Sequence, residues 1–114
     1  MHELSIALNI IDIATAEARK AGAVRVTELH VDVGTLSGVI VEALDMAMQM
    51  AVKNTLLEKA HVHIHSIPAK AQCRECGNEF EAADFFEVCP SCSSFNVAFF
   101  QGKELLVRSL KVTT

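Results

Sequence analysis

The 114-residue chain has no tryptophan and no tyrosine, and only 10 lysines and arginines stand against 14 acidic residues. A net charge of −4, with the basic residues scattered, argues against a nucleic-acid partner, because phosphate contacts need a basic patch. No apolar stretch reaches the roughly 20 residues of a membrane-spanning helix. We therefore expect a soluble protein without a membrane segment, whose partners are other proteins.

Aromatic residues are few, and their distribution marks a boundary in the chain. All 6 phenylalanines fall between residues 80 and 100. A unit of about thirty residues has too little chain for a large core and depends on a metal or on a few large side chains. We expect these phenylalanines to form the core of such a small unit, in preference to a stacking platform for bases.

The same region contains all 4 cysteines of the chain, in two Cys-x-x-Cys pairs: Cys73 with Cys76, and Cys89 with Cys92. Two such pairs can place four thiolates tetrahedrally, as in a structural zinc site. Gly77 and Pro90 suit the tight turns that this requires. The alternatives are two disulfides or a redox dithiol pair. Because nothing at the N-terminus resembles a signal peptide, we expect a reducing, cytoplasmic setting, where disulfides are rare. Four thiolates leave no position for a catalytic water, so the zinc would be structural.

Hydrophobic periodicity predicts two helices and three strands outside this region. Apolar residues at helical spacing run from Leu4 to Ala18 and end before Gly22, a typical residue after a helix C-terminus. The remaining predicted elements are a strand over 24–33, a helix over about 40–54, a strand over 61–65 and a strand over 105–112.

The last predicted strand needs a partner, and the cysteine region offers little apolar surface to receive it. We therefore predict an α+β fold in which the chain returns to the N-terminal unit. Two helices would pack on a three-stranded sheet formed by residues 1–69 and 103–114. Residues 70–102 would form an inserted zinc-ribbon domain whose metal is held by the four cysteines.

Two further groups of residues are capable of binding a metal. In the first, Met1-His2-Glu3, the α-amine, the amide nitrogen of His2 and the imidazole of His2 can close adjacent chelate rings around one ion, and square-planar nitrogen sites of this kind select Ni²⁺ or Cu²⁺. In the second, His61, His63 and His65 share one face of a predicted strand, with Cβ atoms roughly 6.5 to 7 Å apart. That separation is long for two ligands of one ion, which favours solvent-facing histidines that respond to pH over a metal site.

Three motifs together resemble the HypA/HybF family of hydrogenase maturation proteins, and the resemblance covers essentially the whole chain. They are Met1-His2-Glu3, the Gly34-x-Leu36-Ser37-Gly38-Val39 stretch after the first strand, and the paired Cys-x-x-Cys motifs. The resemblance implies a nickel metallochaperone. Ni(II) would be bound by the His2 imidazole, the Met1 amine and the amide nitrogens of His2 and Glu3, and Zn(II) by the four cysteines.

The resemblance also implies the partners. Nickel would be delivered to the large subunit of [NiFe] hydrogenase with the help of a HypB-type GTPase, and some members of the family also serve urease. The alternative is a zinc-ribbon adaptor that binds proteins or nucleic acid and has no nickel role. An enzyme is not expected, because no pairing of a nucleophile with a base is evident. Both a monomer and a homodimer are compatible with the sequence.

Overall fold

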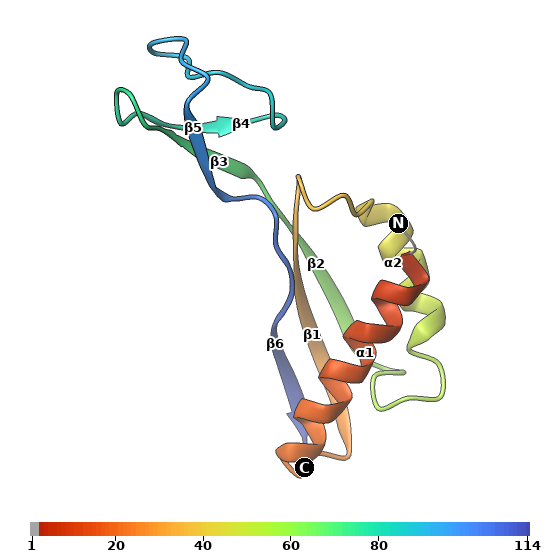
Figure 1. Ribbon diagram of the computed structural model, residues 1–114. Helices are drawn as coiled ribbons and strands as arrows, with labels where there is room; N and C mark the ends of the chain where they lie inside the picture. The colour runs from red at the N-terminus through yellow and green to blue at the C-terminus, as the bar shows by residue number, and fades with distance from the viewer. Residues whose placement is uncertain (1–2) are drawn as a thin grey trace.

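The computed structural model describes residues 3–114, which form two three-stranded sheets at opposite ends of an elongated molecule of 54 × 25 × 17 Å. Helices accompany only one of the sheets, and long loops surround the other (Figure 1). Met1 and His2 lie outside the described residues, so the prediction of their nickel site concerns a part of the chain that the structure does not address.

The first sheet has the strand order β2-β1-β6, with β1 (Arg25–Gly34) in the centre. Strand β2 (His61–Ile67) pairs with β1 in parallel, and β6 (Leu105–Thr113) pairs with β1 antiparallel. A parallel pair needs a crossover connection, and helix α2 (Val41–Ala51) supplies it. The position of β6 confirms the prediction that the chain returns to its N-terminal unit, and with it the predicted α+β fold.

Helix α1 (Glu3–Lys20) and helix α2 cover the same face of this sheet (Figure 1). The chain leaves α1 through Gly22, which has a φ of +70°, and the amide of Ala23 donates to the carbonyl of Ala18 at 2.9 Å. Gly22 is therefore the C-terminal cap that the sequence predicts. Within residues 3–114, neither helix combines the length and the apolar character needed to cross a membrane.

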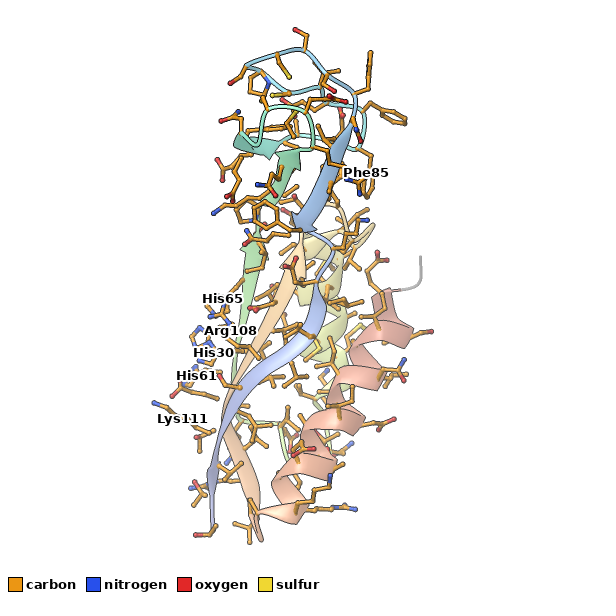
Figure 2. The ribbon with its side chains drawn as sticks, turned by 60° about the vertical axis from the view of Figure 1, so that its left-hand side comes forward. His30, His61, His65, Phe85, Arg108 and Lys111 are labelled. Carbon is orange, nitrogen blue, oxygen red and sulfur yellow. The ribbon has the colours of Figure 1, made fainter. Side chains whose placement is uncertain are left out.

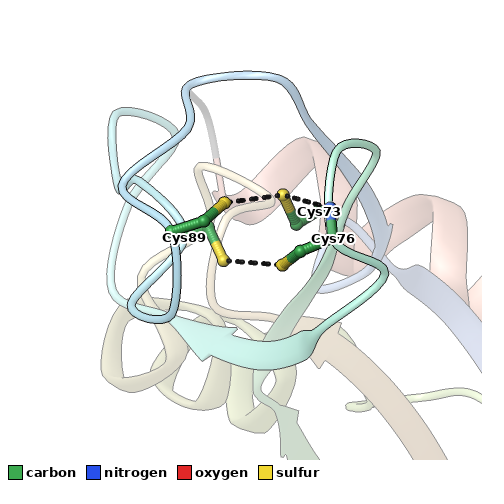
Figure 3. Close-up of side chains that lie close together, drawn as sticks. Cys73, Cys76 and Cys89 are labelled. Carbon is green, nitrogen blue, oxygen red and sulfur yellow. Dashed lines mark hydrogen bonds between the residues drawn. The ribbon is translucent and has the colours of Figure 1, made fainter.

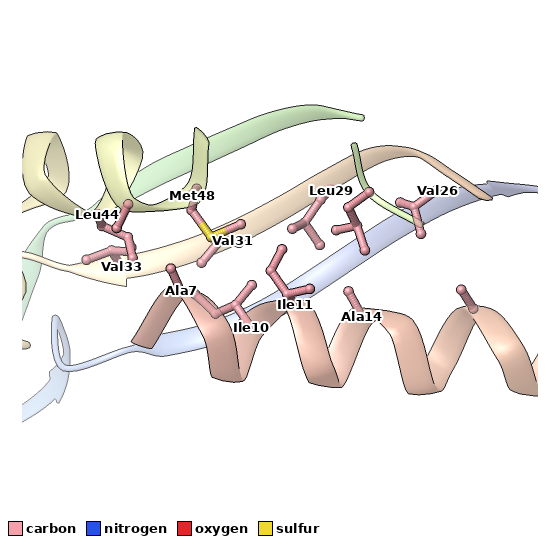
Figure 4. Close-up of a cluster of buried hydrophobic side chains, with 13 residues drawn as sticks. Ala7, Ile10, Ile11, Ala14, Val26, Leu29, Val31, Val33, Leu44 and Met48 are labelled. Atoms are coloured by element: carbon pink, nitrogen blue, oxygen red, sulfur yellow. The ribbon is translucent and has the colours of Figure 1, made fainter. Parts of the chain in front are cut away.

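The core lies between the helices and the first sheet (Figure 4). Alternate residues of β1, Leu29, Val31 and Val33, are fully buried, as a half-buried strand requires. The helices contribute residues at i, i+3, i+4 and i+7 spacing. These are Ala7, Ile10, Ile11, Ala14 and Ala18 from α1, and Leu44, Ala47 and Met48 from α2.

The second sheet has the order β4-β3-β5 and consists of β3 (Ala69–Cys73), β4 (Glu79–Ala82) and β5 (Val97–Gln101). The prediction that phenylalanines form its core is wrong. None of the six is buried, and Phe86 and Phe95 are 87% and 83% exposed. The buried residues here are small or are cysteines, namely Ala69, Ala71, Cys73, Ala82 and Cys89. A unit with such a small core depends on its cysteine site. The predicted domain bounds at residues 69/70 and 102/103 stay a prediction.

Two glycines lie where the two sheets meet. Gly34 ends β1, and its amide donates to the carbonyl of Glu104 at 2.7 Å. A Cβ atom on Gly34 would overlap the backbone carbonyl of Gly102. Gly102 has a φ of +117°, and a Cβ there would lie 2.5 Å from the Cα of Ala69. We call this crossing of Gly34, Ala69 and Gly102 the neck. Only glycine allows the three backbone segments to approach so closely.

The loop after β1 connects the two sheets at the neck. The chain leaves the first sheet through β2 and returns to it through β6, so both connections pass the end of β1. The amide of Thr35 donates to the carbonyl of Ile67 at 2.9 Å, on the outgoing connection, and the amide of Leu36 donates to that of Gly102 at 2.7 Å, on the returning one. The stretch over residues 34–39 therefore has a structural role, because it ties the two sheets together before α2 begins.

We predict that Gly34→Ala lowers the free energy of unfolding by more than about 2 kcal/mol, because the clash is with backbone and no rotamer change relieves it. Gly22→Ala is the control. Its φ is also positive, but a Cβ there meets open space, so the cost should stay near 1 kcal/mol, the penalty of the left-handed conformation. Urea denaturation followed by circular dichroism measures both. Equal losses in the two variants would mean that the neck tolerates a side chain.

Candidate metal centre

The four cysteines converge at the far end of the second sheet (Figure 3). Cys73 is the last residue of β3 and Cys76 follows in the adjoining turn, while Cys89 and Cys92 lie in the loop between β4 and β5. The first cysteine of each pair is buried and the second is exposed. Each Cys-x-x-Cys pair therefore contributes one buried sulfur ligand and one from a solvent-exposed residue.

The two Cys-x-x-Cys turns have the same backbone pattern. In the first, the amide of Gly77 donates to the carbonyl of Cys73 at 2.9 Å, and Gly77 has a φ of +77°. In the second, the amide of Ser93 donates to the carbonyl of Cys89 at 2.8 Å, and Ser93 has a φ of +62°. The sequence identified Gly77 as a turn residue but gave no such indication for Ser93, a residue type that rarely adopts positive φ. A metal held by both turns would offset that local strain.

The sulfur positions fit zinc and do not fit disulfides. The Sγ atoms of Cys73 and Cys92 lie 3.5 Å apart, those of Cys76 and Cys89 lie 3.6 Å apart, and all four lie within 4.8 Å of one another. A disulfide requires about 2.05 Å between the sulfurs. Tetrahedral zinc with bonds of about 2.3 Å places its sulfur ligands about 3.8 Å apart. The chemistry of four thiolates and this spacing both favour a closed zinc site, as the sequence predicts.

In each facing pair of sulfurs, the surroundings lower the pKa of one cysteine and raise the pKa of the other. The pKa is lowered at Cys73 and Cys89. The backbone amide of Cys76, 3.5 Å from the Cys73 sulfur, is the main cause that lowers the pKa of Cys73. Burial raises the pKa of Cys89, but hydrogen bonds from the backbone amides of Cys92 and Ser91 outweigh burial and bring this pKa down to about 6.

The opposite shift occurs at the cysteine that faces each of these two. The Ser94 backbone lowers the pKa of Cys92, but the facing Cys73 sulfur and burial outweigh it and raise this pKa to about 12. The pKa of Cys76 is likewise raised, because the Cys89 sulfur and burial outweigh the Asn78 backbone. Within each facing pair the shifts therefore favour ionisation of one sulfur over the other, and a Zn²⁺ ion would favour the thiolate form of both.

Among the residues of the predicted nickel site, only Glu3 is described. It is the first residue of α1, the helix that packs on the first sheet, and it is partly buried. A second group of possible metal ligands lies on the first sheet and consists of Glu28, His30 and His63. From the sequence we considered His63 only with its neighbours on the same strand, since nothing local to the sequence pairs it with His30.

Comparison with known proteins identifies the family. A family model described as hydrogenase/urease nickel incorporation, metallochaperone, hypA matches residues 1–112. The chain belongs to the HypA family. The hydrogenase maturation factors HypA of Parabacteroides distasonis and Chlorobaculum parvum are each 40% identical to the chain over 112 residues, which is 98% of this chain and 97% and 99% of theirs.

Solved structures agree with this assignment. The solution structure of the nickel metallochaperone HypA from Helicobacter pylori superposes with a TM-score of 0.70 at 25% identity, over 99% of this chain and 98% of that one. A second HypA solution structure gives a TM-score of 0.72, also at 25% identity, over 98% and 96% of the two chains. The family is one of metallochaperones. The prediction that the chain is not an enzyme is therefore confirmed, and the nickel chaperone is favoured over the zinc-ribbon adaptor.

We predict that Cys89→Ser lowers zinc affinity by more than about 100-fold, which exceeds the 10- to 100-fold typical of changes to residues that only support metal ligands. The residues of β3 to β5 should lose amide-exchange protection, while those of β1, β2 and β6 keep it, because only the second sheet depends on the cysteines. Competition with a chromophoric chelator measures the affinity. Ser91→Ala, between the two ligands of the same turn, is the control and should retain zinc. Full zinc retention by Cys89→Ser would exclude Cys89 as a ligand.

Proposed function

We propose that this chain carries Ni²⁺ on its N-terminal nitrogens and delivers it during maturation of [NiFe] hydrogenase. The proposed ligands are the Met1 amine, the His2 amide and imidazole, and the Glu3 amide. The observation that carries the proposal is the match to the nickel-incorporation family, which begins at residue 1 and so includes Met1-His2-Glu3. Nitrogen ligands in a square arrangement are typical of Ni²⁺ and Cu²⁺ sites, whereas the four cysteines suit zinc.

The start of α1 at Glu3 supports the role of the Glu3 amide. The first four N–H groups of a helix have no partner within the helix. Deprotonation of the Glu3 amide therefore breaks no helical hydrogen bond, which would be the cost at any position further along α1. Two deprotonated amides also balance the two charges of Ni²⁺, so the loaded site would place no net positive charge at the positive end of the helix dipole.

The proposed partners are a HypB-type GTPase and the large subunit of [NiFe] hydrogenase, in the cytoplasm, with urease as a second recipient. Exposed apolar side chains on α1 and α2 support a protein partner. Leu4 and Leu8 of α1 are 49% and 48% exposed, and Met46 and Met50 of α2 are 68% and 65% exposed. Leu4 and Leu8 lie in the two helical turns that follow Glu3, so a partner that docks there would be within reach of the nickel ligands.

We predict that His2→Ala abolishes the one-equivalent ligand-field absorption of square-planar Ni²⁺ and leaves zinc content and circular dichroism unchanged. One extra residue placed before Met1 should have the same effect, because it moves the α-amine away from the other ligands. His61→Ala, which removes an imidazole far from α1, is the matched control and should keep the signal. If His2→Ala and the extended chain both keep the absorption, the N-terminal nitrogens are not the nickel site.

Nickel affinity should fall as the pH is lowered from about 7 to about 5.5. Imidazole ordinarily takes up a proton near pH 6.5, and protons also compete with the metal for the amide nitrogens, so the loaded state is lost on the acidic side. Isothermal titration calorimetry across this range measures the change. An affinity that stays constant over the whole range would argue against imidazole and amide ligands.

A further inference from the structure

Three of the histidines named above and one glutamate gather on the face of the first sheet that the helices do not cover, where Figure 2 labels His30 and His65. Glu28 and His30 come from β1, and His63 and His65 come from β2. The parallel register places His30 directly beside His63. Because side chains on alternate positions of a strand share a face, all four project on the side opposite the core.

The side chains of Glu28, His30 and His63 lie close enough to one another to contact a single ion. The Nε2 atoms of His30 and His63 each lie 3.6 Å from the same oxygen, Oε1 of Glu28, and the three ligand atoms lie within 4.8 Å of one another. A tetrahedral ion with bonds of about 2.05 Å holds its ligands about 3.3 Å apart. The two Nε2 atoms need to approach Oε1 of Glu28 by only a few tenths of an ångström, and the two imidazoles need to approach each other from a separation of at most 4.8 Å. The side chain of His63 is 45% exposed and is free to turn from its stacked position on His30.

A fourth residue orients the ligand on β1. Nδ1 of His30 lies 2.8 Å from Nε2 of His65. If Nε2 of His30 binds a metal, its proton must sit on Nδ1, and Nε2 of His65 is placed to accept that hydrogen bond. Metal-binding histidines commonly donate their second nitrogen in this way, which fixes both tautomer and ring orientation. His65 is thus a positioning residue and not a ligand.

The charged groups around the cluster leave one oxygen of Glu28 available. Nζ of Lys111 lies 3.1 Å from the other oxygen, Oε2, and the hydrogen bond from this lysine is the main cause that lowers the pKa of Glu28. The neighbouring carboxylate, Asp32, pairs with Arg108, whose Nη2 and Nε lie 2.8 and 3.1 Å from its two oxygens. Arg108 therefore pairs with Asp32, while Lys111 pairs with Oε2 of Glu28 and leaves Oε1 directed at the imidazoles.

We propose that Glu28, His30 and His63 form a second metal site, which takes a divalent late first-row transition ion with water in the remaining positions. Two imidazoles and one carboxylate suit Ni²⁺ and Zn²⁺ and do not suit Ca²⁺ or Mg²⁺. Three protein ligands leave open positions, so ions can exchange at this site, in contrast to the closed site of the four cysteines. This proposal rests on described residues alone and does not depend on the N-terminal nickel site.

The test uses the untagged, zinc-loaded full chain with His2→Ala, so that the N-terminal imidazole contributes nothing. Calorimetric titration with Ni²⁺ should show one equivalent bound. Further change of His63→Ala should lower that affinity more than 10-fold. His65→Gln should lower it about 10- to 100-fold without changing the stoichiometry, since outer groups typically matter by that amount.

His61→Ala is the matched control. His61 lies on the same strand and face but outside the cluster of ligand atoms, so its loss should leave the affinity within about twofold. Nitrogen-15 spectra of the imidazoles distinguish a ligand from a residue with a purely structural role. Ni²⁺ should broaden the Nε2 resonances of His30 and His63 before those of the other histidines. Because His63 is exposed, His63→Ala should fold even if a change at His30 does not. Absence of nickel binding in the His2→Ala chain would overturn the proposal, and so would equal effects of His61→Ala and His63→Ala.

Discussion

Strand β1 is hydrogen-bonded along both edges, to β2 in parallel and to β6 antiparallel, and the rest of the structure depends on this double pairing. Its inner face carries Leu29, Val31 and Val33 into the core beneath the helices. Its outer face holds His30 beside His63 of β2. Its last residue, Gly34, lies at the neck. A shift of one residue in the pairing of β1 would exchange its two faces and remove both the core and the histidine cluster.

Much of this fold can be predicted from the sequence, because its elements follow strong periodic patterns. Helical spacing predicted α1 and its end at Gly22, and alternation predicted β1, β2 and β6. The second sheet was harder to predict. Its strands have four or five residues, and their core consists of small side chains and cysteines, so its phenylalanines give no periodic signal and were wrongly assigned to a core. Where a metal replaces a core, hydrophobic patterns lose their predictive value.

The histidine cluster could not be found from the sequence for another reason. Along β2 alone, the imidazoles alternate at a spacing too long for a shared ion. The short distances are those between strands, where His30 meets His63 and His65. The register that creates these contacts follows from the packing of the core on the other face, and no local signal in residues 28–30 or 61–65 reports it. Sites built across a parallel pair therefore become visible only when the sheet is assembled.

The four cysteines and the Glu28, His30 and His63 cluster differ in the chemistry of their ligand atoms, and therefore in how readily a bound metal would exchange. Thiolates in a closed tetrahedron hold zinc without an open position, so a passing nickel ion has no route by which to displace it step by step. Nitrogen and carboxylate ligands with open positions allow stepwise exchange. At the histidine cluster the positive charge of Lys111, 3.1 Å from Glu28, opposes any bound cation and limits its affinity. A protein that carries metal as cargo would need weak, accessible ligands kept apart from a zinc site that does not exchange, and in this chain the cysteines and the imidazoles belong to two different sheets.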